Sequence, residues 1–273
     1  MISDALIKKI KKIEIKTGRV IEEIFSGNYR SAFKGNGMEF EEIREYYDGD
    51  DIRNIDWNVT ARQNRPYVKK YREERELNIV LMVDVSASND FGNQREKIAE
   101  IAAAMSLAGV KNGDRASAIF FSDKIEKHIY SGKGNKHALS IIENILKISA
   151  ENKKTDLKTA LEYFEKAEKK SSVLIIISDF LCEGYEKVLK RVSLKHDVIL
   201  IRTVEKAAEK IPKGALFMFE DLETGETIEV DTTSSEIVLS NEYIPKHKNI
   251  ITIYSDEDIV KPLMIFFKRR IRN

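Results

Sequence analysis

One segment restricts the fold of this 273-residue chain more than any other: LNIVLMVDVSASND, residues 77–90. Its apolar run, Ile79 to Val83, is bounded by polar residues, which is typical of a strand buried on both faces of a parallel sheet. Asp84 closes the run, and Ser86 and Ser88 follow in a stretch too polar to continue the strand. We expect this stretch to form a loop at the carboxyl end of the strand, where open α/β sheets bind ligands.

Strands and helices alternate after this segment. The pattern predicts strands at 79–83, 115–121, 125–130, 173–177 and 198–203, and helices at 96–111, 136–147, 157–170 and 186–194. This order is typical of an α/β fold with a doubly wound, mostly parallel sheet of the Rossmann type. Thr224-Gly225, between predicted strands 215–219 and 226–231, indicates a β-hairpin insertion near the C-terminus. A helix around 235–243, a strand at 250–254 and a helix at 256–270 are expected to follow.

The first 76 residues follow a different pattern. Apolar residues at helical spacing, with lysines between them, predict a helix over residues 3–25. Glycines interrupt residues 26–76, where we expect mostly irregular structure with short strands. We therefore divide the chain into an N-terminal extension, 1–76, packed on a main domain, 77–273. The cluster Lys8, Lys9, Lys11 and Lys12 is typical of a solvated helix face, with a nucleic-acid patch as the alternative.

Residues 39–76 combine a polarised charge pattern with the only tryptophan of the chain. Acidic side chains dominate 39–56, and basic side chains dominate 62–76. The two halves can pair with each other as solvated surface, or the segment can dock a partner, because aromatic residues and arginine are enriched at interfaces. An aromatic side chain can also fix an irregular segment to the core. The candidate partner-binding residues are Trp57, Arg53, Arg62, Asp50 and Asp51.

Composition argues against several classes of protein. With 46 basic and 45 acidic side chains, the chain has no broad electrostatic attraction for nucleic acid or an anionic membrane. The longest apolar run, Val173–Ile177, is far shorter than a membrane span. One cysteine, Cys182, allows no internal disulfide, and the N-terminal segment lacks the apolar region of a signal peptide. We therefore expect a cytoplasmic protein that does not insert into a membrane.

Oxygen-bearing side chains recur where the predicted strands end. A second buried strand is followed by Asp179, and Thr155 precedes a predicted helix between the two strands. Because the carboxyl ends of the strands converge at the topological switch point, these side chains can surround one ion. Carboxylates and hydroxyls are hard oxygen donors, the ligands that Mg²⁺ prefers. The alternative is that the same residues only cap turns and helices.

The pattern Asp84-x-Ser86-x-Ser88, with a distant Thr155 and a distant Asp179, resembles the metal-ion-dependent adhesion site (MIDAS) of von Willebrand factor A (vWA) domains. The segments SGNYRSAFKGNGMEF, REYYDGDDIRNIDWNVTAR and YREERELNIVLMVDVSAS resemble the bacterial family named domain of unknown function fifty-eight, which carries such a domain. IISDF, KHDVILI and FEDLETGETIEVDT continue the resemblance, which covers about residues 26–232. The segment TVEKAAEKIP, 203–212, departs from it by lacking an Asp-Pro pair.

The resemblance implies a vWA-like fold and a defined set of ligands. Ser86, Ser88 and Thr155 would offer hydroxyls to Mg²⁺ (or Mn²⁺ or Ca²⁺), and Asp84 and Asp179 would act directly or through bound water. An acidic side chain of a protein partner would complete the metal shell. The family further implies a MoxR-type AAA+ ATPase as partner, in a chaperone-like or complex-maturation role.

We therefore predict a non-enzymatic, metal-dependent protein-interaction module. Two alternatives stay open: a metal-dependent hydrolase of phosphate or peptide bonds, and a scaffold whose degenerate site binds no ion. Hydrolysis needs a base or a cation near the metal, and residues 86–93, SASNDFGN, contain no His, Lys or Arg. The four histidines do not recur at a spacing typical of a shared site. Cys182 has no basic side chain beside it in sequence that could act as a catalytic base, and no P-loop motif is present.

Overall fold

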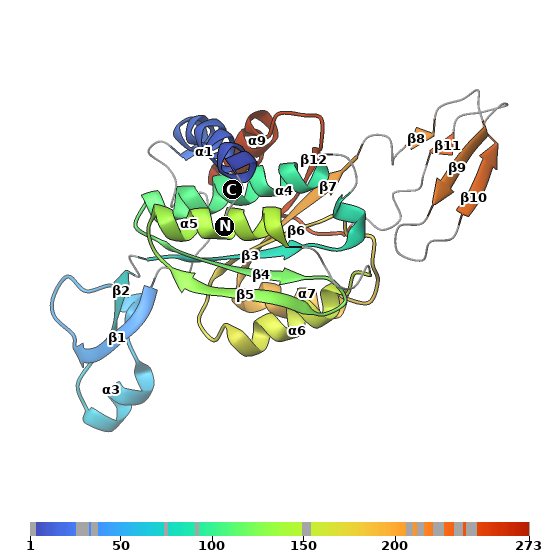
Figure 1. Cartoon of the computed structure of the whole chain (residues 1–273). Helices are drawn as coiled ribbons and strands as arrows, with labels where there is room; N and C mark the ends of the chain where they lie inside the picture. The colour runs from blue at the N-terminus through green and yellow to red at the C-terminus, as the bar shows by residue number, and fades with distance from the viewer. Residues whose placement is uncertain are drawn as a thin grey trace.

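The computed structural model describes residues 4–25, 33, 38–73, 76–90, 93–148, 154–205, 210–211, 216–220, 227–231, 237–238 and 245–272. Its centre is a six-stranded sheet in the order β12-β7-β6-β3-β4-β5 (Figure 1). The strands are β3 (Asn78–Asp84), β4 (Arg115–Phe121), β5 (Ile125–Gly132), β6 (Val173–Ser178), β7 (Asp197–Val204) and β12 (Ile250–Tyr254). All neighbouring pairs are parallel except β4 and β5. The predicted doubly wound, mostly parallel sheet is confirmed.

The chain begins this sheet in the middle. From β3 it adds β4 and β5 on one side, then crosses to the other side of β3 and adds β6, β7 and β12. In the order in which the six strands enter, this is the 3-2-1-4-5-6 arrangement of doubly wound sheets, in which the direction of winding reverses between the first and fourth strands. These strands are β3 and β6, so the residues that follow them lie at the switch point.

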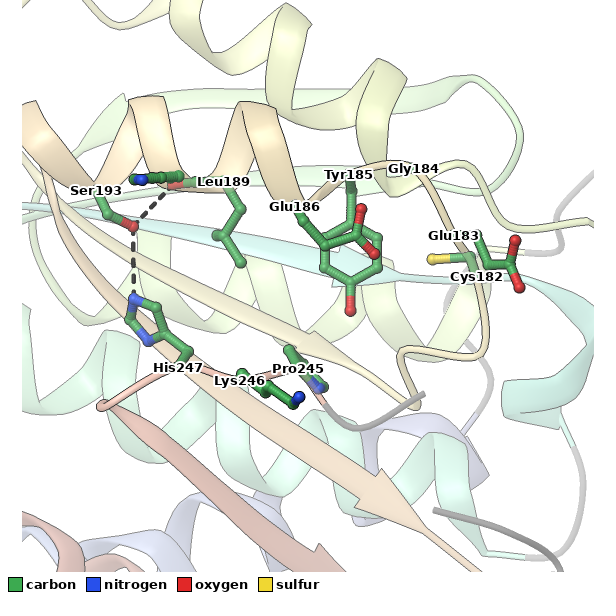
Figure 2. A pocket seen from close by; sticks show the side chains of 11 residues that line it. Cys182, Glu183, Gly184, Tyr185, Glu186, Leu189, Ser193, Pro245, Lys246 and His247 are labelled. Atoms are coloured by element: carbon green, nitrogen blue, oxygen red, sulfur yellow. Dashed lines mark hydrogen bonds between the residues drawn. The ribbon is translucent and has the colours of Figure 1, made fainter. Parts of the chain in front are cut away.

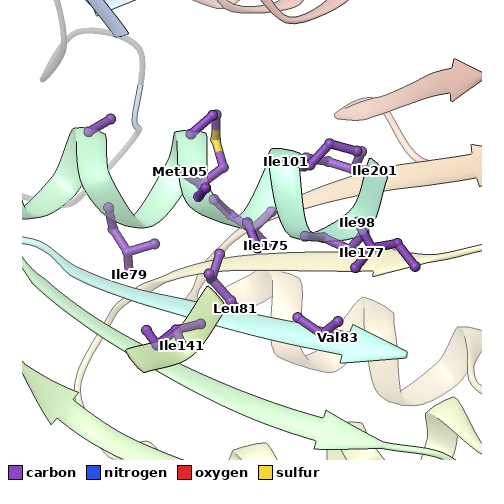
Figure 3. Close-up of a cluster of buried hydrophobic side chains, with 14 of the residues drawn as sticks. Ile79, Leu81, Val83, Ile98, Ile101, Met105, Ile141, Ile175, Ile177 and Ile201 are labelled. Atoms are coloured by element: carbon purple, nitrogen blue, oxygen red, sulfur yellow. The ribbon is translucent and has the colours of Figure 1, made fainter. Parts of the chain in front are cut away.

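Both faces of the sheet are buried. Ile79, Leu81 and Val83 of β3 pack in the layer beneath α4 (Figure 3), while Val80 and Met82 belong to the layer on the opposite face. Helices α4 (Gln94–Lys111), α5 (Asn135–Lys147) and α9 (Val260–Arg272) contribute to the first layer, and α6 (Leu157–Ala167) and α7 (Glu186–Lys195) contribute to the second. Burial on two faces explains why these strands are continuously apolar in the sequence.

Helix α1 (Asp4–Phe25) shares the core of the first layer. Ile13 and Ile21 are buried in the same cluster as the sheet residues, which confirms the predicted amphipathic helix. Lys16 pairs with Glu100 of α4, at 2.8 Å between Nζ and Oε2. The extension therefore contributes to the hydrophobic core through this helix. Within the described part of the chain, every helix is too short or too polar to span a bilayer.

The expectation of mostly irregular structure in residues 26–76 is wrong for much of the described segment. β1 (Met38–Glu45) and β2 (Tyr67–Glu73) form an antiparallel pair, and η1 (Ile52–Asn54) and α3 (Trp57–Gln63) lie between them. The register shifts between Phe40 and Glu42, and such a bulge interrupts the alternation by which a strand is recognised. Figure 1 shows this unit projecting from the sheet.

The C-terminal part contains two small antiparallel pairs before β12. β9 (Leu216–Glu220) pairs with β10 (Thr227–Asp231), as the hairpin prediction required, and β8 (Lys210–Ile211) pairs with β11 (Ile237–Val238). The predicted helix around 235–243 is wrong at 237–238, which form β11 because they pair with β8; its other residues lie outside the described ones. α9 begins at Val260 rather than at residue 256, because the carboxylate of Asp258 accepts the Val260 N–H at 2.7 Å, before the helix.

Candidate metal site

The loop after β3 is held by its own carboxylate. Asp84 is fully buried, and its Oδ1 accepts the backbone N–H of Ser86 at 2.9 Å. This is an Asx-turn, the local bond by which aspartate ends regular structure. The short helix η2 (Ala87–Asp90) follows, with the Asn89 N–H donating to the Ser86 carbonyl at 3.1 Å. Asp84 therefore fixes the backbone that carries the two serines.

The loop after β6 meets this one across the switch point. The Ser178 hydroxyl donates to Asp84 Oδ2 at 2.7 Å and accepts the Phe180 N–H at 3.0 Å. Asp179 Oδ1 accepts the Leu181 N–H at 3.0 Å. Phe180 has a φ of +60°, which is a costly conformation for a bulky residue and is tolerated only when the surroundings hold it. The turn that presents Asp179 is thus fixed at both ends.

Four of the five predicted ligands form one connected cluster. The hydroxyl oxygens of Ser86 and Ser88 are 3.1 Å apart. The side chain of Ser86 lies close enough to the carboxylate of Asp84 to lower its pKa, and that of Ser88 does the same to Asp179. The structure therefore brings Asp84, Ser86, Ser88 and Asp179 together from two loops that are almost a hundred residues apart in sequence.

Thr155 lies in a third loop at the same edge, half-buried. The next residue, Asp156, donates its N–H to the carbonyl of Ser122, just beyond β4, and its side chain caps α6 by accepting the Thr159 N–H at 2.9 Å. Among the hydrogen bonds of the described residues, none joins Thr155 to the other four candidates. The structure therefore places Thr155 at the same edge of the sheet as the cluster, with no hydrogen bond to it among the described residues.

The two carboxylates of the cluster carry an electrostatic cost. Burial and, second to it, the negative charge of Asp179 together raise the pKa of Asp84 to about 7, although hydrogen bonds from Ser86 and Ser178 act in the opposite direction. Burial also raises the pKa of Asp179, while its hydrogen bonds to Leu181 and Ser88 and the positive charge of Arg202 lower it. A divalent cation would remove the repulsion between the carboxylates. Its donors would be hard oxygens, because the cluster consists of carboxylates and hydroxyls. Among the described residues, no group of three or more His, Cys, Asp or Glu side chains is arranged to hold a metal ion, so the serine hydroxyls would have to complete the set.

Positively charged side chains are absent from residues 86–93, but the fold brings two of them from elsewhere in the chain. Arg202 is buried on β7, where it pairs with Ser178 in the sheet, and its charge acts on Asp179. Arg95 Nη2 donates to the Val85 carbonyl at 3.4 Å. The fold therefore supplies two guanidinium groups that residues 86–93 do not. A charged residue within the apolar strand 198–203 was the signal in the sequence for Arg202.

The buried side-chain amides of Asn89 and Gln94 pair behind the loop that carries Ser86 and Ser88, and the sequence did not indicate them. Gln94 Nε2 donates to the Thr203 carbonyl at 3.1 Å and to Asn89 Oδ1 at 3.2 Å, and Asn89 Nδ2 donates to the Ser86 hydroxyl at 3.2 Å. A carbonyl only accepts, so Thr203 fixes the orientation of both amides. Ser86 therefore accepts from Asn89, which leaves its proton for a neighbouring oxygen and its remaining lone pair for a cation.

Comparison with known proteins identifies the family. The model of the family described as "Protein of unknown function DUF58" matches residues 42–243. The chain belongs to this family. The uncharacterized proteins Rv1480 of Mycobacterium tuberculosis and Mb1516 of Mycobacterium bovis are each 27% identical to it over 227 residues, covering 81% of this chain and 72% of theirs.

Solved structures resemble the DUF58 chain weakly. BatB from Bacteroides thetaiotaomicron aligns with a TM-score of 0.46 at 14% identity, covering 72% of this chain and all of its own. The SpRpn10 VWA domain gives 0.40 at 8% identity, over 71% of this chain and 95% of that domain. Proximal thread matrix protein 1 from the mussel byssus, "with zinc occupied MIDAS motif", gives a TM-score of 0.40 at 14% identity, covering 72% of this chain and 47% of that protein. The assignment of a vWA-like fold rests on the strand order and the flanking helices of this chain.

A pocket of about 790 Å³ lies beside the candidate site, between α7 and residues 245–247. Cys182 is at one end and His247 at the other (Figure 2), so they do not form a nucleophile and base pair. Burial and the charges of Asp84, Asp179 and Asp156 raise the pKa of the Cys182 thiol to about 12, which keeps it protonated at neutral pH. This agrees with a structural role for the cysteine.

The four histidines are dispersed, as expected. His128 hydrogen-bonds to Tyr163, His137 to the Ala116 carbonyl, His196 to Ser172 and His247 to Ser193. Burial lowers the pKa of His196 to about 4, and it lies at the amino end of β7, opposite the candidate site. The histidines thus have local partners away from the cluster.

The candidate partner-binding residues lie on the β1–β2 unit, apart from the metal site. Asp50 pairs with Arg44 at 2.7 Å, and Asp51 pairs with Arg53 at 2.8 Å. Lys69 and Asp56 are 3.3 Å apart, so the acidic and basic halves do pair with each other, as one of the interpretations proposed. The remaining candidates, Arg62 and Trp57, are exposed residues of α3.

Trp57 is 68% exposed, which argues against the interpretation that it fixes the segment to the core. We expect Trp57→Ala to change the free energy of unfolding by less than about 0.5 kcal/mol, as for other surface substitutions. Urea unfolding followed by far-UV circular dichroism measures this change. The matched control is Phe33→Ala, which removes a buried aromatic side chain and should cost about 3–5 kcal/mol. A loss for Trp57→Ala as large as that of the control would place the tryptophan in a packing role.

The amide pair makes a prediction about metal affinity. Replacing Gln94 with methionine keeps the side-chain length but removes both donated hydrogen bonds, so Asn89 loses its fixed orientation toward Ser86. We expect Mg²⁺ affinity to fall about 10- to 100-fold, as for other residues that orient metal ligands. Isothermal titration calorimetry measures the affinity. Ile101→Val, in the same helix, is the control for a general loss of stability; if it lowers the affinity equally, Gln94 has no specific role.

Proposed function

We propose that this DUF58 protein is a non-enzymatic module that binds a protein partner through a divalent cation. Asp84, Ser86, Ser88, Thr155 and Asp179 would hold the ion. The observation that carries the proposal is the pair of buried, mutually repelling carboxylates beside two serine hydroxyls 3.1 Å apart, at the switch point of the sheet. Open α/β sheets bind ligands at this position.

The chemistry of the cluster favours Mg²⁺, with Mn²⁺ or Ca²⁺ as other hard cations. When bound, the ion supplies a positive centre that attracts an anionic ligand. Two carboxylates balance the charge of a divalent ion, and neutral hydroxyls add no further negative charge. An acidic side chain of the partner would complete the metal shell, so binding would be selective for an acidic protein surface.

The proposed partner is a MoxR-type AAA+ ATPase, in a chaperone-like or complex-maturation role, within the cytoplasm. Its support is the resemblance to the family in residues 26–232. The β1–β2 unit would add a second contact, because Trp57, Tyr47 and Ile52 are each more than 60% exposed there. Exposed large apolar side chains of this kind mark sites of protein interaction.

A metal-dependent hydrolase is the second candidate, and one observation favours it: the guanidinium of Arg202 acts on Asp179, where it would also stabilise a developing negative charge. Against it, the thiol of Cys182 stays protonated and the histidines have partners elsewhere. A third candidate, a scaffold that binds no ion, leaves the repulsion of the two carboxylates uncompensated.

A capture experiment separates these candidates. The full chain is immobilised and incubated with a purified MoxR-type ATPase in Mg²⁺ or in EDTA, and p-nitrophenyl phosphate hydrolysis is measured on the same preparation. We expect retention in Mg²⁺, release in EDTA, and no turnover above buffer. Asp84→Asn should abolish retention, whereas Glu143→Gln, at an exposed ion pair of α5, should preserve it. Retention that survives EDTA contradicts the metal link, and turnover that EDTA stops supports the hydrolase.

A further inference from the structure

Helices α1 and α9 lie side by side on the outside of the first layer (Figure 1). Their inward faces are buried, with Ile13 and Ile21 on α1 and Leu263 and Phe267 on α9. Their outward faces are both basic and also carry exposed large apolar residues. Ile15 of α1 is 71% exposed and Ile265 of α9 is 57% exposed. Two amphipathic helices would ordinarily leave only polar residues on such a face.

The positive charge of this face is not balanced locally. The exposed basic residues are Lys8, Lys11 and Lys12 on α1, and Lys261, Lys268 and Arg269 on α9. None of them forms a salt bridge with another described residue, whereas Lys9 and Lys16, on the flank of α1, pair with glutamates of α4. The whole chain has a formal net charge of only +1. The six basic residues therefore form a positively charged patch on a chain that is nearly neutral overall.

A groove runs between the two helices. Its volume is about 790 Å³, and its floor is formed by Ile15, Val260 and Met264. Lys12 and Lys261 stand at its rim and form no salt bridge with another described residue, whereas Lys16, which also lines the groove, pairs with Glu100. One acid, Asp258, lines it too, and one of its oxygens accepts the Val260 N–H. An apolar floor under a basic rim is complementary to apolar side chains flanked by acids. Met264 adds adaptability, because methionine adjusts to differently shaped partners.

We propose that the α1–α9 groove binds an acidic segment of a partner protein, whose apolar side chains enter the groove while its carboxylates pair with the rim lysines. The rim lysines favour a negatively charged partner, and the apolar floor favours a protein segment with apolar side chains. A nucleic acid would leave Ile15, Val260 and Met264 without partners. An anionic lipid bilayer is the competing surface, because basic amphipathic helices also lie on such membranes, so the test includes anionic vesicles. Helix-in-groove binding uses the same combination of apolar anchors and flanking charge.

This surface is independent of the proposed metal site, so its test is run in EDTA. The probe is a fluorescein-labelled peptide of Glu-Glu-Leu-Leu repeats, about 16 residues long, enough for roughly four helical turns. Fluorescence anisotropy is measured with the full chain, and we expect saturable binding that weakens with salt. Replacing both Lys12→Glu and Lys261→Glu should weaken binding at least about tenfold, because like charges then face the peptide. Ile15→Ser should weaken it as well.

Three controls make the result specific. Lys158→Glu with Lys187→Glu changes net charge equally, at exposed positions on the opposite face, and should leave the affinity unchanged. A peptide with serine in place of leucine should bind more weakly than the leucine peptide. Phosphatidylserine vesicles and duplex DNA should bind more weakly still. Equal binding of the serine peptide, an equal loss in the control variant, tighter binding of vesicles or DNA, or no binding of the leucine peptide would each overturn the proposal.

Discussion

Replacing Asp84 with asparagine is expected to make the metal-free protein more stable and to remove its response to Mg²⁺. The substitution keeps the side-chain shape and the oxygen that accepts the Ser86 N–H, but it removes one of two repelling buried charges. A pKa raised from 3.8 to about 7 lowers the free energy of unfolding by on the order of 4 kcal/mol at pH values above 7, where the carboxylate is charged. Asparagine also has a burial cost, so we expect a net gain of about 1–3 kcal/mol at pH 8.

The gain should depend on pH. Because the pKa of Asp84 is higher in the folded than in the unfolded state, its contribution to stability is complete below pH 3.8 and is lost as the pH rises through about 7. The pKa of Asp179 is raised in the same direction. Metal-free wild type should therefore lose stability between about pH 4 and pH 7, and Asp84→Asn should lose less.

Urea unfolding in EDTA at pH 5 and pH 8, followed by melting with and without Mg²⁺, tests both parts. Wild type should gain melting temperature with Mg²⁺, and the variant should not. Glu143→Gln is the matched control, because it neutralises a carboxylate of an exposed ion pair on α5. If the variant is less stable than wild type at pH 8, the charge of Asp84 does not destabilise the metal-free protein. If the variant still responds to Mg²⁺, Asp84 is not a metal ligand.

Replacing Arg270 with leucine is expected to destabilise the folded chain strongly. Arg270 Nη2 and Asp197 Oδ2 are 2.6 Å apart, with side chains only 4% and 5% exposed, and this pair joins α9 to β7. The substitution leaves the carboxylate of Asp197 buried without its guanidinium partner. Removing one member of a buried ion pair typically costs about 3–5 kcal/mol.

A double-mutant cycle measures the coupling between these two residues. Arg270→Leu combined with Asp197→Leu should be less destabilised than the sum of the two single variants, because no unpaired charge remains buried. Lys268→Leu changes an exposed basic residue of the same helix and should cost less than about 0.5 kcal/mol. Equal effects of Lys268→Leu and Arg270→Leu, measured by urea unfolding, would mean that the ion pair does not hold α9 to the sheet.

The central sheet was predictable because burial on two faces leaves a local mark on the sequence. β3 is a short apolar run that ends at Asp84, β6 is one that ends at Ser178 and is followed by Asp179, and the strand order places both carboxylates at one crevice. β1 was missed because the bulge between Phe40 and Glu42 breaks its alternation. The two-residue strand β11 was missed because only its pairing with β8 defines it, and pairing is not visible locally.

The candidate site was predictable only in part, for the same reason. Asp84, Ser86 and Ser88 share one short motif, so their proximity follows from spacing. Arg202 and Gln94 reach the site from β7 and α4, through contacts between residues far apart in sequence. Side chains that tune or orient a ligand need not adjoin it in the chain, and the tertiary fold alone brings them to it.

A crystal of the full chain soaked in Mn²⁺, with anomalous diffraction data, would locate the ion itself. One strong peak is predicted between the loops that follow β3 and β6, within roughly 2.0–2.6 Å of the Ser86 and Ser88 hydroxyl oxygens. The carboxylates of Asp84 and Asp179 should bind it directly or through one water. Anomalous density elsewhere on the molecule, or none at saturating Mn²⁺, would contradict a metal site at this edge of the sheet.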